Sequence, residues 1–166
     1  AGKGERQAKT FEAIAASSLW PGSIVESAQM VENQEDRLEV RMVIKVPDQV
    51  LSSSGRLALP IVALDGWKRL FSRPSRHYPL MVAGFRWLRL ELSSQAGPLK
   101  LTGDHVVVKG PSYEGQFNCQ DDGRCVLEEQ IKRVVVPPSD YTELARHHSA
   151  FRQAMVQGEL RLDEKP

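Results

Sequence analysis

Several features that would indicate a defined chemistry are missing from this sequence of 166 residues. Lys plus Arg total 22 and Asp plus Glu total 21, so the chain lacks the strong basic excess that is typical of nucleic-acid-binding domains. No apolar run approaches the roughly 20 residues that a membrane-spanning helix requires. We therefore expect neither nucleic acid as a partner nor a membrane span in this chain. The 41% of hydrophobic residues is typical of a folded globular protein.

The sequence also lacks the residue spacings and motifs that bind a metal or activate a nucleophile. Its two cysteines have no second cysteine pair and no matching histidine pair, so zinc-ligand spacing is lacking. Asp121 and Asp122 supply too few ligands for calcium, which takes roughly six to eight oxygens. There is no Gly-x-Ser-x-Gly motif, no phosphate-binding glycine-rich loop and no His-Glu-x-x-His motif. We expect no cofactor, no metal and no catalytic residue, and the chain is predicted not to be an enzyme.

Alternating hydrophobic residues predict a chain built mainly of β-strands. In the clearest run, over 38–46, every second residue is apolar and most of the intervening residues are polar, which indicates a strand with one buried face. In 85–92 the apolar phase shifts by one residue between Trp87 and Leu88, which predicts a β-bulge, and we expect Trp87 in the core. Further strands are predicted over 23–31, 57–64, 99–101, 105–109, 117–119 and 125–136.

Cys119 and Cys125 flank the turn sequence at 120–124, which contains Asp122-Gly123 between two β-rich runs. This pattern predicts a hairpin in which the two cysteines face each other. A disulfide there would stabilise the fold by about 2 kcal/mol, and it would indicate an oxidising compartment. A thiol enzyme would need a free cysteine beside a histidine, and the disulfide would remove that nucleophile. The alternative is two separate reduced thiols.

The C-terminal part changes to helical periodicity. Asp140 followed by Glu143 matches a capping box, which predicts Asp140 as the N-cap. One apolar stripe then follows at three- and four-residue spacing, formed by Tyr141, Leu144, His148, Phe151 and Met155. We expect His148 to be packed and His147 to be solvated. The predicted fold is an antiparallel β-sandwich with a C-terminal α-helix. Its parts are an N-terminal segment (1–18, a short helix or disordered), a β-sandwich domain (19–138), the helix (139–158) and a tail (159–166).

A basic and aromatic loop is the candidate interaction surface. Arg73, Arg76, His77 and Tyr78 lie together in the segment 73–79, which contains two prolines, a composition that suits an anion or a protein partner. The alternative is a proline-rich loop in which Tyr78 packs on the sheet. Two tryptophans next to turns are added to this surface, Trp20 and Trp67. If exposed, they could stack on a carbohydrate.

Two stretches resemble a known family. Trp67 to Phe71 with Arg76-His77-Tyr78-Pro79-Leu80, and Val136 to Leu144, are similar to motifs of the β-rich domain of unknown function that follows the transglutaminase-like (papain-type) core in large bacterial proteins. The likeness covers about residues 20–156 and implies a β-sandwich whose catalytic Cys-His-Asp lies in a neighbouring domain outside this chain. Such proteins are often exported or membrane-attached, so the resemblance agrees with a periplasmic or otherwise extracytoplasmic location.

The expected function is therefore that of a non-catalytic accessory or interaction domain, part of a longer transglutaminase-like bacterial protein. Its expected partners are other domains of the same chain or a partner protein. The alternative is a stand-alone β-module that binds a carbohydrate or another ligand. A small hydrolase or transferase of unrecognised type is the third hypothesis.

Overall fold

The computed structural model describes residues 24–33, 38–46, 56–57, 67, 70–82, 86–95, 99–157 and 160–164. Within these ranges the chain divides into two compact units. Strands β1 (Ile24–Asn33) and β2 (Leu38–Lys45) belong to one unit, and every described residue from Arg56 onward belongs to the other. The β domain predicted over 19–138 thus includes strands of both units. The predicted N-terminal segment at 1–18, Trp20 and nearly all of the strand predicted at 57–64 lie outside the described residues.

The first unit contains an antiparallel hairpin. Its register runs from Ile24 opposite Lys45 to Asn33 opposite Leu38, with two irregularities in β1. The strands predicted over 23–31 and 38–46 are confirmed. The apolar residues Val40, Met42 and Ile44 are half-buried.

The centre of the second unit is a four-stranded antiparallel sheet with the order β5-β9-β8-β7. The strands are β5 (Trp87–Ser93), β7 (Val106–Lys109), β8 (Tyr113–Cys119) and β9 (Arg124–Ile131). The register places Leu90 and Phe117 directly opposite Leu127, so these side chains share one face of the sheet. We call this the inner face. Residues of the opposite, outer face are mostly polar and charged.

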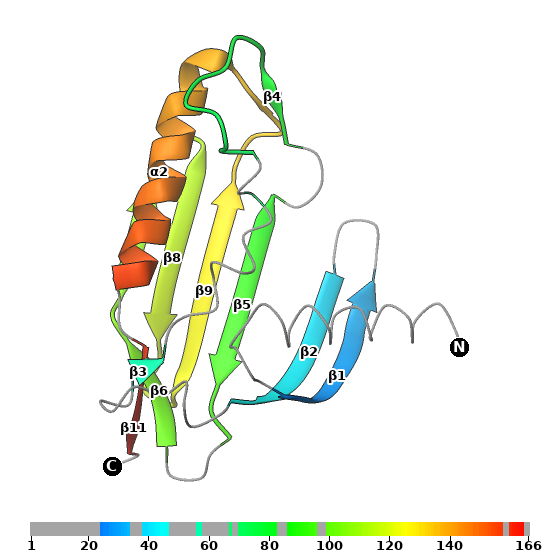
Figure 1. Ribbon diagram of the computed structural model, residues 1–166, viewed down its shortest axis with the longest axis vertical. Helices are drawn as coiled ribbons and strands as arrows, with labels where there is room; N and C mark the ends of the chain where they lie inside the picture. Colours follow the sequence, from blue (N-terminus) through cyan, green and yellow to red (C-terminus); the bar gives the residue numbers. More distant parts are fainter. Residues whose placement is uncertain are drawn as a thin grey trace. The chain divides into compact units, whose positions relative to one another are not determined.

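Helix α2 (Pro138–Gln157) packs on the inner face against β7 and β8. Figure 1 shows α2 running along β8. All five residues of the predicted stripe are buried, which confirms the helical prediction. Gly115 of β8 permits the close approach, because a Cβ at this position would lie 2.8 Å from Cγ of Phe151.

The helix begins two residues earlier than its predicted N-cap. Tyr141 N–H donates to the carbonyl of Pro137, so Pro138 occupies the first helical turn, where its missing N–H costs nothing. Asp140 is therefore inside the helix, and the N-cap prediction was wrong. Its carboxylate instead pairs with Arg133, at 2.5 Å. His147 is half-buried with its ring against Gly110, so the prediction of a solvated His147 was also wrong.

The second unit also contains a three-stranded antiparallel sheet with the order β3-β11-β6. Its strands are β3 (Arg56–Leu57), β6 (Leu99–Gly103) and β11 (Leu160–Glu164), and β6 contacts β5, β8 and β9 of the larger sheet. The tail predicted at 159–166 thus contains a strand. Alternating Leu160-Arg161-Leu162-Asp163 is a strand pattern, and the first leucine is buried.

Strand β5 corrects two predictions. Its pairing with β9 is uninterrupted from Trp87 to Ser93, so the structure has no bulge between these residues. Trp87 lies on the outer face and is 48% exposed, because it shares its phase with Arg89 and Glu91 rather than with the leucines. The fold class itself is confirmed: the chain is mainly β, with antiparallel sheets and a C-terminal helix.

Candidate interaction surface and buried charge cluster

A short two-stranded ribbon presents apolar side chains to solvent. Strand β4 (Leu80–Met81) pairs with β10 (Val135–Val136), with Met81 opposite Val135 and Leu80 opposite Val136. Leu80 and Val136 are buried, whereas Met81 is 66% exposed and Val135 46% exposed. The ribbon therefore has one apolar face in the core and a second apolar pair facing outward.

Two further residues close to the ribbon in the sequence are also exposed. Tyr78, three residues before Met81, is 82% exposed, and Val134 is about half exposed beside Val135. The Val134 carbonyl accepts a hydrogen bond from the Val82 N–H at 2.8 Å, which continues the ribbon pairing. We call Tyr78, Met81, Val134 and Val135 the β4–β10 surface. Tyr78 does not pack on the sheet, so that alternative is wrong.

The loop before β4 is held to helix α2 by side-chain contacts. The Tyr141 hydroxyl lies 2.7 Å from the Arg73 carbonyl and 3.0 Å from the Leu70 carbonyl, and donates its proton to them. The Arg76 guanidinium lies 5.0 Å from the centre of the Tyr141 ring and donates to the Leu70 carbonyl. Arg76 is thus a half-buried anchor of the loop rather than an exposed binding residue.

The remaining predicted surface residues have three different outcomes. Arg73 and His77 are exposed, in the same loop as Tyr78. Trp67 is only 7% exposed, and its ring centre lies 6.2 Å from that of His148, so it belongs to the core and cannot stack on a sugar. Trp20 lies outside the described residues.

A buried charge cluster, which was not predicted from the sequence, joins α2 to the sheet. Glu129 of β9 is 1% exposed and accepts a 2.6 Å hydrogen bond from the Tyr113 hydroxyl at Oε1. Arg152 donates to Oε2 of the same carboxylate, and His148 Nε2 lies 4.0 Å from Oε1. The His148 ring also stacks on Phe71, with 4.4 Å between ring centres. We call Tyr113, Glu129, His148 and Arg152 the Glu129 cluster.

The arrangement of the Glu129 cluster fits a structural role. A buried carboxylate requires a charged or hydrogen-bonding partner, and here two of the partners come from α2, one helical turn apart. Tyr113, Glu129 and His148 are all buried, so the described residues enclose the carboxylate. The sequence did contain a signal: Glu129 shares its strand phase with Cys125, Leu127 and Ile131, so an inward-facing glutamate could have been expected.

The outer face carries paired surface charges. Glu114 lies 3.0 Å from the Lys109 ammonium and 3.3 Å from that of Lys132. Hydrogen bonds from Lys109, and next from Lys132, lower the pKa of the Glu114 carboxyl below its ordinary value of 4.5. Arg89 pairs with Glu91 and Glu128, and these carboxylates raise the pKa of its guanidinium. Such exposed pairs contribute little to stability individually.

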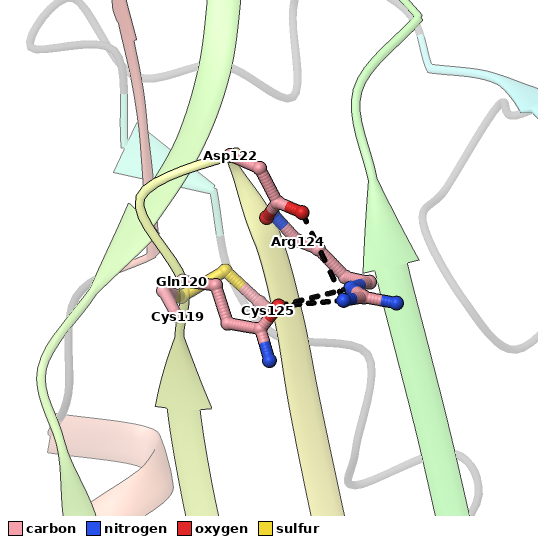
Figure 2. Close-up of a disulfide and its surroundings, with 5 residues drawn as sticks. All are labelled: Cys119, Gln120, Asp122, Arg124 and Cys125. Atoms are coloured by element: carbon pink, nitrogen blue, oxygen red, sulfur yellow. Dashed lines mark hydrogen bonds and ion pairs between the residues drawn. A yellow bond between two sulfur atoms is a disulfide. The ribbon is translucent and has the colours of Figure 1, made fainter.

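Cys119 and Cys125 form the predicted disulfide across the β8–β9 hairpin (Figure 2). They are directly opposite in the register, and Cys125 is fully buried. Figure 2 also shows Arg124 reaching Gln120 and Asp122 of the turn. With both cysteines bonded, the chain has no free thiol, which removes the nucleophile that a thiol enzyme would need.

Comparison with known proteins adds no relative: no family model, no curated protein and no solved structure matches the chain. The resemblance to the transglutaminase-associated domain rests on the motifs at 67–80 and 136–144. Among the described residues, no helix combines the length and the hydrophobicity that crossing a membrane requires.

Proposed function

We propose that this chain is a non-catalytic interaction domain that binds a partner protein, or another domain of its own polypeptide, through the β4–β10 surface. The observation that carries the proposal is the exposure of the Met81–Val135 pair on a ribbon whose other face is already buried. The Met81 and Val135 side chains are not part of the hydrophobic core of the second unit. Clustered exposed apolar and aromatic side chains are typical of protein-binding surfaces.

The surroundings of the β4–β10 surface support binding to a protein. The loop that carries Tyr78 is held by Tyr141 and Arg76, so little conformational freedom is lost when a partner binds. Arg73 and His77 are exposed in the loop that carries Tyr78 and add polar and cationic groups, which suit the polar rim of an interface. This charge favours an acidic rim on the partner.

We infer that the domain works in an oxidising, extracytoplasmic compartment, because disulfides persist there and are rare in the cytosol. Its motifs favour the role of an accessory domain beside the catalytic core of a bacterial transglutaminase-like protein. In that setting the β4–β10 surface would position the catalytic core or recruit its partner.

Site-specific photocrosslinking in cells that produce the protein tests this proposal. A photoreactive amino acid is placed at Tyr78, and in a control variant at Asn118, which is exposed on the outer face of β8. We expect one dominant adduct from position 78, identified by mass spectrometry as a single protein or as another segment of the same polypeptide. Absence of an adduct at position 78, or equal adducts at both positions, would refute the proposal.

A further inference from the structure

Strand β5 forms one end of the four-stranded sheet, and no other strand of the described residues pairs with its second edge. The edge is regular, because pairing with β9 continues without a shift over all seven residues. Natural edge strands are usually protected by charged side chains, above all lysine, by proline or by a bulge. From Trp87 to Ser93 the strand has no lysine, no proline and no bulge, and its two charged residues, Arg89 and Glu91, have opposite signs. Its backbone is therefore suited to pair with a further strand.

The sequence of β5 is complementary to itself in the antiparallel direction. Leu90 is its centre, Arg89 and Glu91 flank it with opposite charges, and Leu88 and Leu92 follow on either side. A two-fold axis at Leu90 would place Arg89 opposite Glu91 of the second copy, and Leu88 opposite Leu92 of the second copy. Directly opposite residues in antiparallel strands share a face, so charges meet charges and leucines meet leucines.

Both faces of the strand have side chains available for this pairing. Leu88, Leu90 and Leu92 are only half-buried at the edge of the inner face. On the outer face, the side chains of Arg89 and Glu91 are 43% and 44% exposed and lie 3.3 Å apart. Pairs with Glu128 and Arg124 on β9 continue this row of alternating charges across the sheet.

We propose that two copies of this chain pair edge to edge through β5, antiparallel and centred on Leu90. The two sheets then join into one continuous eight-stranded sheet, with a leucine ladder on the inner face and reciprocal Arg89–Glu91 pairs on the outer face. A second copy is the occupant because the charge order of β5 complements its own. The contact is isologous, as expected for a two-fold dimer, and it does not use the β4–β10 surface.

Cysteine crosslinking of the full chain tests the register. In a Leu90→Cys variant the two thiols lie directly opposite each other, as Cys119 and Cys125 do, and we expect a disulfide-linked dimer on mild oxidation. In Leu88→Cys or Leu92→Cys alone, the thiols of the two copies lie four residues apart along the strand, about 13 Å. That distance is too long for a disulfide, so we expect crosslinking to be at least about tenfold slower. Mixing the Leu88→Cys and Leu92→Cys chains should restore it.

Two further measurements make the outcome decisive. Light scattering of the unmodified chain should give twice its mass of 18.6 kDa at micromolar concentration. A Val107→Cys variant tests β7, the other edge of the sheet, and should not crosslink. A monomer at every concentration, equal crosslinking of the Leu88→Cys and Leu90→Cys variants, or crosslinking only of Val107→Cys would each overturn the proposed dimer.

Discussion

Substituting glutamine for Glu129 removes the negative charge that α2 and the sheet share. The Glu129 side chain is fully enclosed, whereas that of Arg152 is 12% exposed. Removing one partner of a buried ion pair costs about 3–5 kcal/mol, because the other charge stays in a poorly solvated place. We expect about 3 kcal/mol for Glu129→Gln, since the glutamine oxygen can still accept the Tyr113 hydrogen bond.

Thermal unfolding of the oxidised protein measures this loss. For a chain of this length, 1 kcal/mol shifts the Tm by about 2–4 °C, so Glu129→Gln should lower the Tm by about 6–12 °C. At room temperature, the far-ultraviolet circular dichroism spectrum of Glu129→Gln should match that of the unmodified protein, because the pairing of the strands does not depend on this charge.

The neighbouring glutamate provides a matched control. Glu128 lies on the outer face with a side chain 24% exposed, and it accepts hydrogen bonds from Arg89 and Gln116. Glu128→Gln should cost only about 1 kcal/mol. In addition, a Glu129→Leu/Arg152→Met double variant should regain much of the stability, because no charge then stays buried. A stabilising role of the buried Glu129–Arg152 pair is excluded if Glu128→Gln costs as much as Glu129→Gln, or if the effects of the two substitutions in the double variant simply add.

Three further predictions concern the β8–β9 hairpin and the outer face. Replacing Cys119 and Cys125 together by alanine should cost about 2 kcal/mol, seen as a lower urea midpoint that dithiothreitol no longer changes. Gly123→Ala should cost about 1–3 kcal/mol by the same assay, because φ is +82° and the new Cβ would lie 2.6 Å from Cβ of Lys100. Carboxyl NMR should show a lowered pKa for Glu114, so its stabilising contribution is present above the unfolded pKa and is lost as the pH falls through the folded pKa. A Glu114 pKa at or above 4.5 would contradict this assignment.

Hydrophobic periodicity and turn residues correctly predicted the elements that are specified by local sequence, namely the C-terminal helix and the Cys119–Cys125 hairpin. The helical stripe was correct because each of its residues meets the inner face, and the Cys119–Cys125 hairpin was correct because Asp-Gly turns fix a short register. Trp67 and Trp87 were both misplaced. Their burial depends on which face of the sheet α2 covers. Neither the composition nor the turn residues indicate which face that is.

The residues of the candidate sites also divide into those that local sequence indicates and those that depend on long-range packing. The sequence indicated Arg73, His77 and Tyr78, because a basic loop that contains two prolines is visible locally. It could not indicate Met81 and Val135, since their exposure results from a pairing between segments more than fifty residues apart. The Glu129 cluster also depends on long-range packing, although the strand phase of Glu129 was available as a signal.

Hydrogen–deuterium exchange tests the proposed interaction surface most directly, because it reports on every segment of the chain at once. Exchange is compared between the purified chain and the chain bound to the partner that crosslinks at position 78. We expect slower exchange over 78–82 and 134–136 in the complex, with no change over β8. Protection confined to other segments, with 78–82 and 134–136 unchanged, would contradict it.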